Sequence, residues 1–340
     1  MESGQKAGLT FKQIIILIIY IVVFVLGTVG NALVIFVTGY KMKRTVNSIW
    51  FLNLALADFL FMSFLILNII SISQNYNWPF GLFMCKSNTL ISVLNMFASI
   101  FLLATISLDR CLLTWLTVWT QNHRTPFKAW ITCLFIWVAA VAFSIPFATY
   151  REVVVKQITF CGTIAPKSVK ITLAMLRFTV GFLIPFIVII CSYIAIGVKV
   201  LRLQRDKKLR PFKIILTVIL AFFLCWLPFH IQQLSLVLGK WNEDKAKALA
   251  SATPFTVILA YLNSCLNPIL YMFMCDQFKT KLRQSLLLVL ENAFAEEHFS
   301  FLSHRHSISS HHTENQTETK TKIITVFPVT PLDGTTSTEN

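Results

Sequence analysis

Few charged side chains stand inside the long apolar stretches of this chain, and they are the residues best suited to bind ions. Asp58 and Arg177 lie within such stretches, and Asp109 and Arg110 close another. A carboxylate at membrane depth costs free energy unless it has a partner. A buried arginine costs about 2.5–3.5 kcal/mol on insertion scales, and a bidentate pair with a bound anion would offset this cost. Asp58 is therefore a candidate cation site and Arg177 a candidate anion site.

Helix-face counting places amide and hydroxyl groups beside Asp58. One carboxylate among neutral oxygens suits Na⁺, which is a hard cation. The alternative is a dry hydrogen-bond network that holds no ion. The candidate neighbours are Asn31, Asn95, Ser99, Asn263, Ser264 and Asn267.

Seven long apolar blocks are the elements that must position these groups. Hydrophobic residues make up 56% of the 340 residues and charged residues 13%, where a soluble domain carries about 25% charged residues. This composition excludes a disordered chain and argues against a soluble enzyme. Because a spanning helix needs about 20 apolar residues, we predict an all-α membrane protein, a seven-transmembrane helix bundle. The blocks cover residues 14–40, 48–73, 87–108, 129–149, 171–198, 214–238 and 248–274.

The loops after the first, third and fifth blocks hold more Lys and Arg than the other loops, which predicts an extracellular N-terminus and a plasma-membrane protein. The net charge of +15 then reflects topology, and no nucleic-acid partner is expected. We divide the chain into an extracellular N-terminus (1–13), the bundle (14–274), an amphipathic eighth helix (275–292) and a disordered cytoplasmic tail (293–340). The eighth helix lies on the membrane surface or, alternatively, docks on a soluble partner.

The chain has eight cysteines, and in this topology only Cys85 and Cys161 share the oxidising side of the membrane. We therefore predict a disulfide between them. Residues 153–160 are rich in β-branched residues on both sides of a polar pair, which predicts a hairpin next to this bridge. No His/Cys/Asp cluster and no nucleophile–base pair falls in one compartment, so no enzymatic activity is expected.

Short motifs recur at fixed places in the blocks, and in this order they resemble those of rhodopsin-like (class A) G-protein-coupled receptors. Segments 78–81, 94–99 and 118–125 resemble the chemoattractant cluster of that class, which includes chemerin, formyl-peptide and chemoattractant-type prostaglandin D receptors. The class motifs are Gly30-Asn31, residues 54–58, residues 109–111, Trp137, Pro146, Pro185, Tyr193, Phe222, residues 225–228, Asn263-Ser264 and residues 267–271.

The resemblance implies an activation switch and a sodium pocket at Asp58. Lys208 stands where many relatives carry an acid that clamps Arg110, so the inactive lock is expected to rest on Asp109 alone. Relatives carry a proline at the position of Thr117 in the second inner loop, which puts G-protein activation in question. The switch residues are Asp109, Arg110, Tyr193, Phe222, Trp226, Asn267, Pro268 and Tyr271.

The resemblance also points to the ligand. Ser92 replaces the aspartate of amine receptors and Tyr261 the lysine of opsins, so neither a monoamine nor retinal is expected. Arg177 is expected to hold a ligand carboxylate; the alternative is an arginine that snorkels or is paired internally. His230 is expected in the pocket wall, with a pH sensor as the alternative. The candidate ligand-binding residues are Arg177, Arg151, Val93, Phe229, His230 and Gln233.

The expected function is a chemoattractant-type receptor for an extracellular anionic peptide or lipid. It would activate a heterotrimeric G protein, with the inhibitory class favoured, and recruit arrestin after tail phosphorylation. No cofactor is expected besides the allosteric sodium ion. The alternatives are a non-signalling or arrestin-biased decoy, or a divergent formyl-peptide receptor in which Val93 and Leu173 replace an acid and an arginine.

Overall fold

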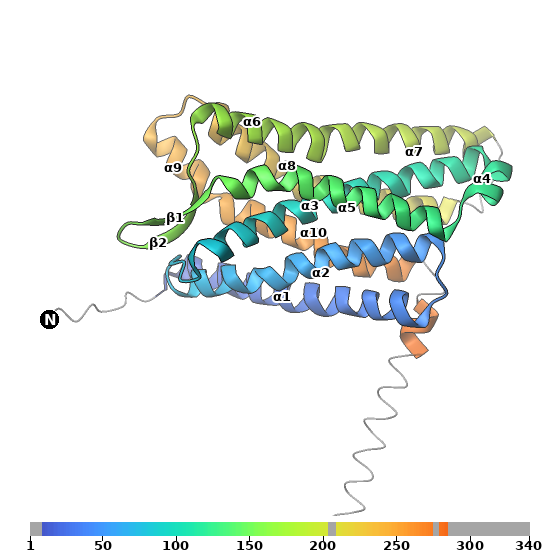
Figure 1. Ribbon diagram of the computed structural model, residues 1–340, viewed down its shortest axis with the longest axis horizontal. Coiled ribbons are helices and arrows are strands. Elements are labelled where there is room, and N and C mark those ends of the chain that lie inside the picture. The colour runs from blue at the N-terminus through green and yellow to red at the C-terminus, as the bar shows by residue number, and fades with distance from the viewer. Residues whose placement is uncertain (1–8, 203–208, 275–278, 285–340) are drawn as a thin grey trace, which may run out of the picture. The chain divides into compact units, whose positions relative to one another are not determined.

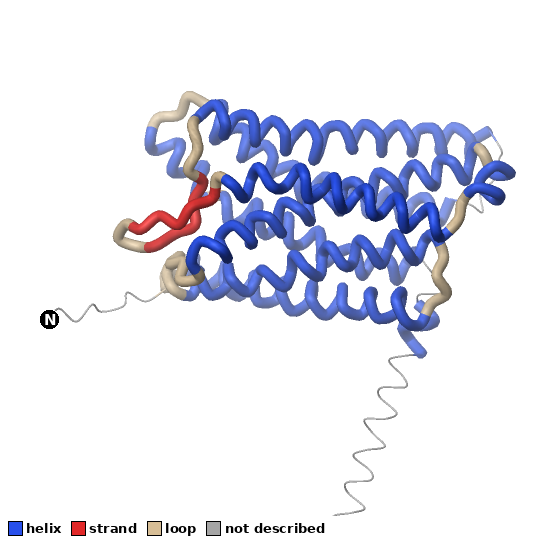
Figure 2. Tube along the Cα trace, viewed as in Figure 1, coloured by secondary structure: helices blue, strands red, loops and turns tan. Residues whose placement is uncertain are grey.

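The computed structural model describes residues 9–202, 209–274 and 279–284, and it places the side chains of all of these except 209–218 and 270–274. Within these residues seven helical segments are long and apolar enough to cross a membrane, which confirms the predicted fold class. They lie side by side, and the chain turns back at each end (Figure 1). The regular secondary structure of the described residues is helical apart from one two-stranded hairpin (Figure 2).

The segments have the following bounds. The spanning helices are α1 (Phe11–Phe36) with the π-helical turn η1 (Val37–Lys41), α2 (Val46–Ser73), α3 (Gly81–Trp115), α5 (Pro126–Thr149), α6 (Lys167–Phe178) with η2 (Thr179–Leu183) and α7 (Ile184–Arg202), α8 (Leu209–Leu238), and α9 (Glu243–Ser251) with α10 (Thr253–Met274). The shorter elements are α4 (Thr117–His123), β1 (Arg151–Val155) and β2 (Thr159–Thr163).

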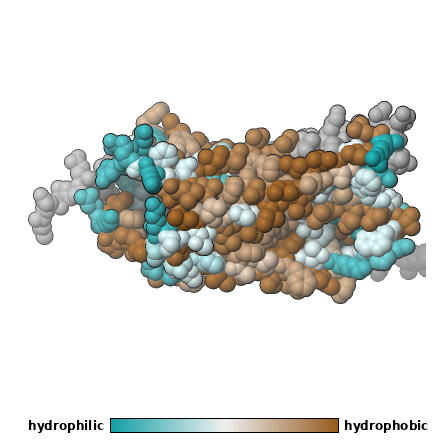
Figure 3. Space-filling view, turned by 90° about the horizontal axis from the view of Figure 1, so that it is seen from above, coloured by the Kyte–Doolittle hydropathy of each residue, from teal (hydrophilic) through white to brown (hydrophobic). Residues whose placement is uncertain are grey.

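Apolar side chains cover the middle of the bundle's flank, and hydrophilic ones gather toward its two ends (Figure 3). This is the surface expected of helices whose backbone groups are bonded internally while their side chains face lipid. Polar residues cap the N-terminal ends of several helices. Thr45 and Ser48 form a capping box at the start of α2, and Thr125 caps α5 just before Pro126. Such caps satisfy backbone N–H groups that have no partner inside the helix.

Helix α3 is the centre of the bundle. In its most apolar window 67% of residues are buried, against 22% for α1. The largest buried cluster combines α3 residues such as Phe97 and Ile100 with residues of α2, α5, α7 and α8. At the margin, Gly27 lets α1 approach α2 closely, because a Cβ there would lie 2.7 Å from the Met62 sulfur.

The hairpin forms where the sequence predicted it. Strands β1 and β2 are antiparallel, with Val155 opposite Thr159 next to the turn and Val153 opposite Cys161. Cys161 is bonded to Cys85 near the start of α3, with 5.6 Å between their Cα atoms, which confirms the predicted disulfide. The bridge ties the hairpin to α3. We call this end of the bundle the hairpin end.

Some helices are longer than the apolar blocks from which they were predicted. Helix α3 runs from Gly81 to Trp115, although its apolar block covers only 87–108, because the charged residues Lys86, Asp109 and Arg110 end the apolar block but not the helix. The seventh span is broken at Ala252 between α9 and α10. Of the predicted eighth helix only residues 279–284 are described, and they are helical. The predicted tail lies outside the described residues.

Candidate functional site

A cavity of about 790 Å³ opens into the bundle at the hairpin end; we call it the front cavity. It lies between α1, α2, α3, α6, α8 and the segment from α9 to α10. Four of the predicted ligand-binding residues, Val93, Arg151, Arg177 and Phe229, line it. On the opposite wall Phe61 stacks on Tyr261 with ring centroids 4.3 Å apart, and Tyr20 packs against Tyr261 edge to face. A largely apolar pocket of this size with a few polar groups is typical of a ligand site.

Arg177 on α6 presents its guanidinium between two aromatic rings. Its central carbon lies 4.4 Å from the ring centroid of Phe147 and 5.4 Å from that of Phe229. These rings stabilise the cation through cation–π contacts. Its Nε is buried and has no hydrogen-bond partner among the described residues. The alternative that Arg177 is paired internally therefore finds no partner in the described part of the chain.

Arg151 begins β1 and lies beside Arg177 in the cavity wall. Its Nε is likewise buried without a hydrogen-bond partner among the described residues, and burial lowers the pKa of its guanidinium. The neighbouring carboxylate of Glu152 is paired with Lys86, at 3.6 Å between Oε1 and Nζ. The hairpin thus places a second cation, Arg151, in the cavity wall, and the adjacent Glu152 carboxylate is paired with Lys86.

A smaller cavity of about 160 Å³, the back cavity, shares both arginines with the front cavity. Gln233, the fifth predicted ligand-binding residue, lines the back cavity only. Its other wall residues include Lys170 and Leu173 of α6, Phe147 of α5 and Thr163 of β2. Arg177, Arg151 and Thr89 line both cavities, and we call the two arginines, where the cavities meet, the arginine partition.

His230 is not where the sequence placed it. It lines neither cavity and is 1% exposed. Its ring packs against Phe182, with centroids 4.8 Å apart, and against Phe178, Trp226 and Phe229. Helix α8 turns this side chain toward α6 and η2, so it packs against Phe178, Phe182 and Phe229 and lines neither cavity.

Asp58 is fully buried, and both of its oxygens accept short hydrogen bonds. The Ser264 hydroxyl donates to Oδ1 at 2.7 Å and the Asn267 amide to Oδ2 at 2.7 Å. Turning the Asn95 amide over would let its nitrogen donate to Asp58 Oδ1 at 3.2 Å and to the Ser99 hydroxyl at 3.1 Å. Four of the predicted neighbours thus gather around the carboxylate.

The other two predicted neighbours lie further out. Asn31 donates to the carbonyls of Gly27 and Ser264, at 2.9 and 3.1 Å, and so joins the cluster through the backbone of α10. Asn263 is buried on the same helix. One carboxylate with serine and asparagine oxygens suits a hard monovalent cation. No cluster of three or more His, Cys, Asp and Glu side chains suited to a metal occurs among the residues described.

The predicted aromatic switch lies below the front cavity. Trp226 and Phe222 are buried on consecutive turns of α8, with ring centroids 6.0 Å apart, and Trp226 also forms part of the cavity wall. Tyr193 on α7 neighbours Arg110 and Ser107 of α3. Asn267, as described, binds Asp58, and Pro268 lies inside α10. The side chain of Tyr271 and the whole of Lys208 lie outside the described residues.

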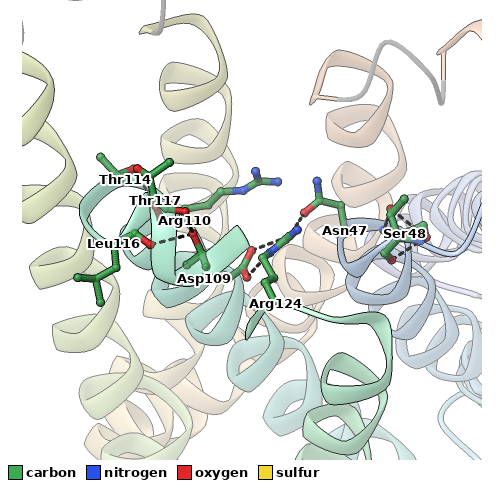
Figure 4. Close-up of polar contacts among 10 residues, drawn as sticks. Asn47, Ser48, Asp109, Arg110, Thr114, Leu116, Thr117 and Arg124 are labelled. Atoms are coloured by element: carbon green, nitrogen blue, oxygen red, sulfur yellow. Dashed lines mark hydrogen bonds and ion pairs between the residues drawn. The ribbon is translucent and has the colours of Figure 1, made fainter. Parts of the chain in front are cut away.

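Asp109 has a different partner from the one expected. Both of its oxygens accept from Arg124, with Nε to Oδ1 at 2.7 Å and a terminal nitrogen to Oδ2 at 2.9 Å. The same terminal nitrogen of Arg124 donates to Asn47 of α2 at 2.6 Å, so Arg124 lies between Asp109 and Asn47 (Figure 4). Adjacent residues on a helix face different directions, and the Asp109 carboxylate here meets Arg124, two residues before α5 begins at Pro126.

In the sequence Arg124 is one residue of the 118–125 segment and Lys170 is a loop charge, and neither was assigned a role in a site. Each acquires its role from residues distant in the chain. Thr117 raised doubt, yet it begins α4, and its hydroxyl donates to the Leu113 carbonyl at 3.1 Å. The turn after α3 therefore forms without a proline.

In this membrane-spanning helix bundle the front cavity reaches Trp226, which packs on Phe222, and the bundle also holds the buried polar cluster around Asp58. The profile of "7 transmembrane receptor (rhodopsin family)" matches residues 30–271. The chain therefore belongs to the rhodopsin-like (class A) G-protein-coupled receptors, and its relatives place it among those of the chemoattractant type. This is a family of multi-pass membrane receptors and not of enzymes.

Three relatives illustrate the likeness. The chain is 44% identical to the C3a anaphylatoxin chemotactic receptor of Oncorhynchus mykiss over 288 residues, 80% of this chain and 77% of the relative. It is 37% identical to chemerin-like receptor 1 of Homo sapiens over 326 residues, 89% and 87% of the two chains. It is 36% identical to N-formyl peptide receptor 2 of Macaca mulatta over 315 residues, 87% and 90%.

Proposed function

We propose that this receptor binds an extracellular peptide or lipid through a carboxylate that Arg177 and Arg151 hold. The observation that carries the proposal is the guanidinium of Arg177 in the cavity wall, which lies over the rings of Phe147 and Phe229 and has a buried Nε without a partner among the described residues. When aromatic rings cover its faces, a guanidinium binds anions at its edge. The edge N–H groups match a carboxylate in bidentate geometry.

We place the hairpin end and the N-terminus outside the cell, at the plasma membrane. A disulfide persists in oxidising compartments, and Cys85 and Cys161 form theirs at this end. The front cavity then opens to the extracellular side, and the surface around Arg110 and α4 faces the cytoplasm.

We further propose that ligand binding shifts the bundle to a state that activates an inhibitory-class G protein. Trp226 supports this coupling, because it forms part of the cavity wall and packs on Phe222. Motion at the ligand could therefore reach the α8 core and then Arg110. Class A relatives couple to G proteins. Arrestin recruitment by the phosphorylated tail is proposed from its many Ser and Thr residues.

Sodium is proposed as an allosteric ligand of the inactive state. Asp58, Ser99 and Ser264 would hold the ion, which supplies a positive charge for a carboxylate that is otherwise held by neutral donors. The oxygens gathered there support the proposal.

A decoy that internalises ligand without G-protein activation is the second candidate. Thr117, at the position of the relatives' proline, favours it, although α4 still forms. A divergent formyl-peptide receptor is the remaining alternative, and Val93 and Leu173 in the cavity walls argue against standard formyl-methionine recognition.

A cell-based screen separates these possibilities. Carboxylate lipids, chemerin-type C-terminal peptides and formyl peptides would be applied while G-protein activation and arrestin recruitment are recorded. We expect a G-protein response that Arg177→Ala weakens by more than tenfold in potency and Arg177→Lys weakens less, because a charged hydrogen bond contributes about 1.5–3 kcal/mol. A response unchanged in Arg177→Ala would refute the anchor. Arrestin recruitment without G-protein activity would establish the decoy.

A further inference from the structure

The two cavities are lined by cations and by no acid. Lys12, Arg151 and Arg177 line the front cavity, and Arg151, Arg177 and Lys170 line the back cavity. No Asp or Glu lines either cavity among the described residues. Lys12 is already engaged at the rim, where its Nζ donates to the Ser251 carbonyl at 3.4 Å and lies over the Phe255 ring. Lys12 thus has polar and aromatic contacts at the rim, whereas Arg151 and Arg177 each keep a buried Nε without a partner among the described residues.

One carboxylate does not balance this charge. The Nε atoms of both guanidiniums are buried, and the two arginine charges repel each other. The exposed Lys170 lines the back cavity with them and adds a third positive charge. A single ligand carboxylate in the front cavity would neutralise one of the three. A second negative group on the far side of the partition would neutralise another.

The back cavity has the size and chemistry for that second group. Its volume of about 160 Å³ corresponds to roughly five water molecules at about 30 Å³ each. This is room for an acid group and a carbon or two, and too little for the body of a ligand. The Gln233 amide and the Thr163 hydroxyl add neutral donors to its walls.

We propose that the ligand is a diacid. One carboxylate meets Arg177 and Arg151 from the front cavity, and a second acidic group passes the partition into the back cavity beside Lys170. The apolar remainder lies in the front cavity, between the arginines and the wall of Phe61 and Tyr261. This inference rests on the proposed function, because both acids share its arginines. A C-terminal acidic residue of a peptide and a dicarboxylate lipid head have the same chemistry here.

The test compares each diacid with its monoamide, which has the same size and one charge less. The lipid arm uses dodecylsuccinate and its monoamide, and the peptide arm uses short apolar peptides ending in Asp or in Asn. Binding of tritiated probes would be measured on the full-length receptor in nanodiscs. The variants are Lys170→Gln, Arg177→Ala and, as the matched control, Lys167→Gln, an exposed lysine of α6 that lines neither cavity.

We expect the wild type to prefer the diacid by about tenfold in one arm, as one charged hydrogen bond would give, and that arm names the source. Lys170→Gln should remove the preference and leave monoamide binding unchanged, Lys167→Gln should change neither, and Arg177→Ala should weaken both probes. Equal binding of diacid and monoamide, or a preference that survives Lys170→Gln, would overturn this inference alone. If neither pair binds the wild type, the carboxylate anchor falls as well.

Discussion

Removing Arg124 should destabilise the receptor more than its place in a loop suggests. Its guanidinium joins three segments: it is bonded to both oxygens of Asp109 on α3 and to Asn47 on α2, and it lies just before α5. Only 21% of the Arg124 side chain and 13% of the Asp109 side chain are exposed. The pair is therefore mostly withdrawn from water, where screening is weak.

The size of the effect follows from this burial. Losing one partner of a fully buried ion pair costs about 3–5 kcal/mol, and exposed pairs contribute about 0–1 kcal/mol. For a bidentate pair with the exposures given above we expect Arg124→Ala to cost about 2 kcal/mol. For 340 residues, at about 2.1 cal/mol/K of unfolding entropy per residue, this corresponds to a fall in melting temperature of roughly 3 °C.

The assay is a thermal melt of the purified receptor without ligand, on Arg124→Ala, Asp109→Asn and the double variant. Each single change should lower the melting temperature, and the double variant should lower it by less than their sum, because both remove the same interaction. Arg44→Ala is the matched control, since that arginine makes a cation–π contact at 6.0 Å with Trp130. A melt of Arg124→Ala within 1 °C of wild type, or additive effects, would refute the reasoning.

Two further predictions concern the polar core and the disulfide. Sodium chloride should raise the melting temperature of the wild type relative to choline chloride at equal ionic strength, and Asp58→Asn should abolish the difference; a wild type indifferent to sodium removes the ion from the account. Cys85→Ser should cost about 2–5 kcal/mol of stability and reduce cell-surface expression as much as Cys161→Ser does. The double variant should be no worse than either, and a worse double variant would mean that the two cysteines act separately.

The fold was largely predictable because its main signal is the length of the apolar blocks, which predicts membrane-spanning helices. Seven apolar blocks each long enough to span the membrane leave few arrangements for the chain. The hairpin and its disulfide followed from β-branched residues around Cys161 and from membrane sidedness. Helix ends were less predictable, since α3 continues past the charged residues that end its apolar block and reaches Trp115. The break at Ala252 between α9 and α10 was missed, although Pro254 in the first turn of α10 is a signal of a helix start.

The candidate site was predictable where charge is costly. Asp58 and Arg177 stand out because an ionised group inside an apolar block needs a compensating partner, and the structure places polar or aromatic groups around both. His230 was misplaced because two residues next to each other on a helix can face a cavity or the core behind it. Small rotations of α8 decide this, and sequence spacing does not record them.

The remaining features depend on contacts between distant segments. Arg124 reaches Asp109 and Asn47 across 15 and 77 residues of sequence. The back cavity exists only because β1, β2, α5, α6 and α8 converge at Arg151 and Arg177. Periodicity and local motifs carry no information about such meetings, so the sequence assigned no site role to Lys170 or Arg124.

The central claim is that a ligand carboxylate meets Arg177, and one comparison tests it most directly. The strongest agonist from the cell screen and its version with a neutral amide in place of the carboxylate would be titrated on wild type and on Arg177→Ala, with G-protein activation as the readout. We predict that removing either the carboxylate or the guanidinium lowers potency by more than about tenfold and that removing both lowers it little further. Independent, multiplying losses, or full potency of the amide on wild type, would contradict the account.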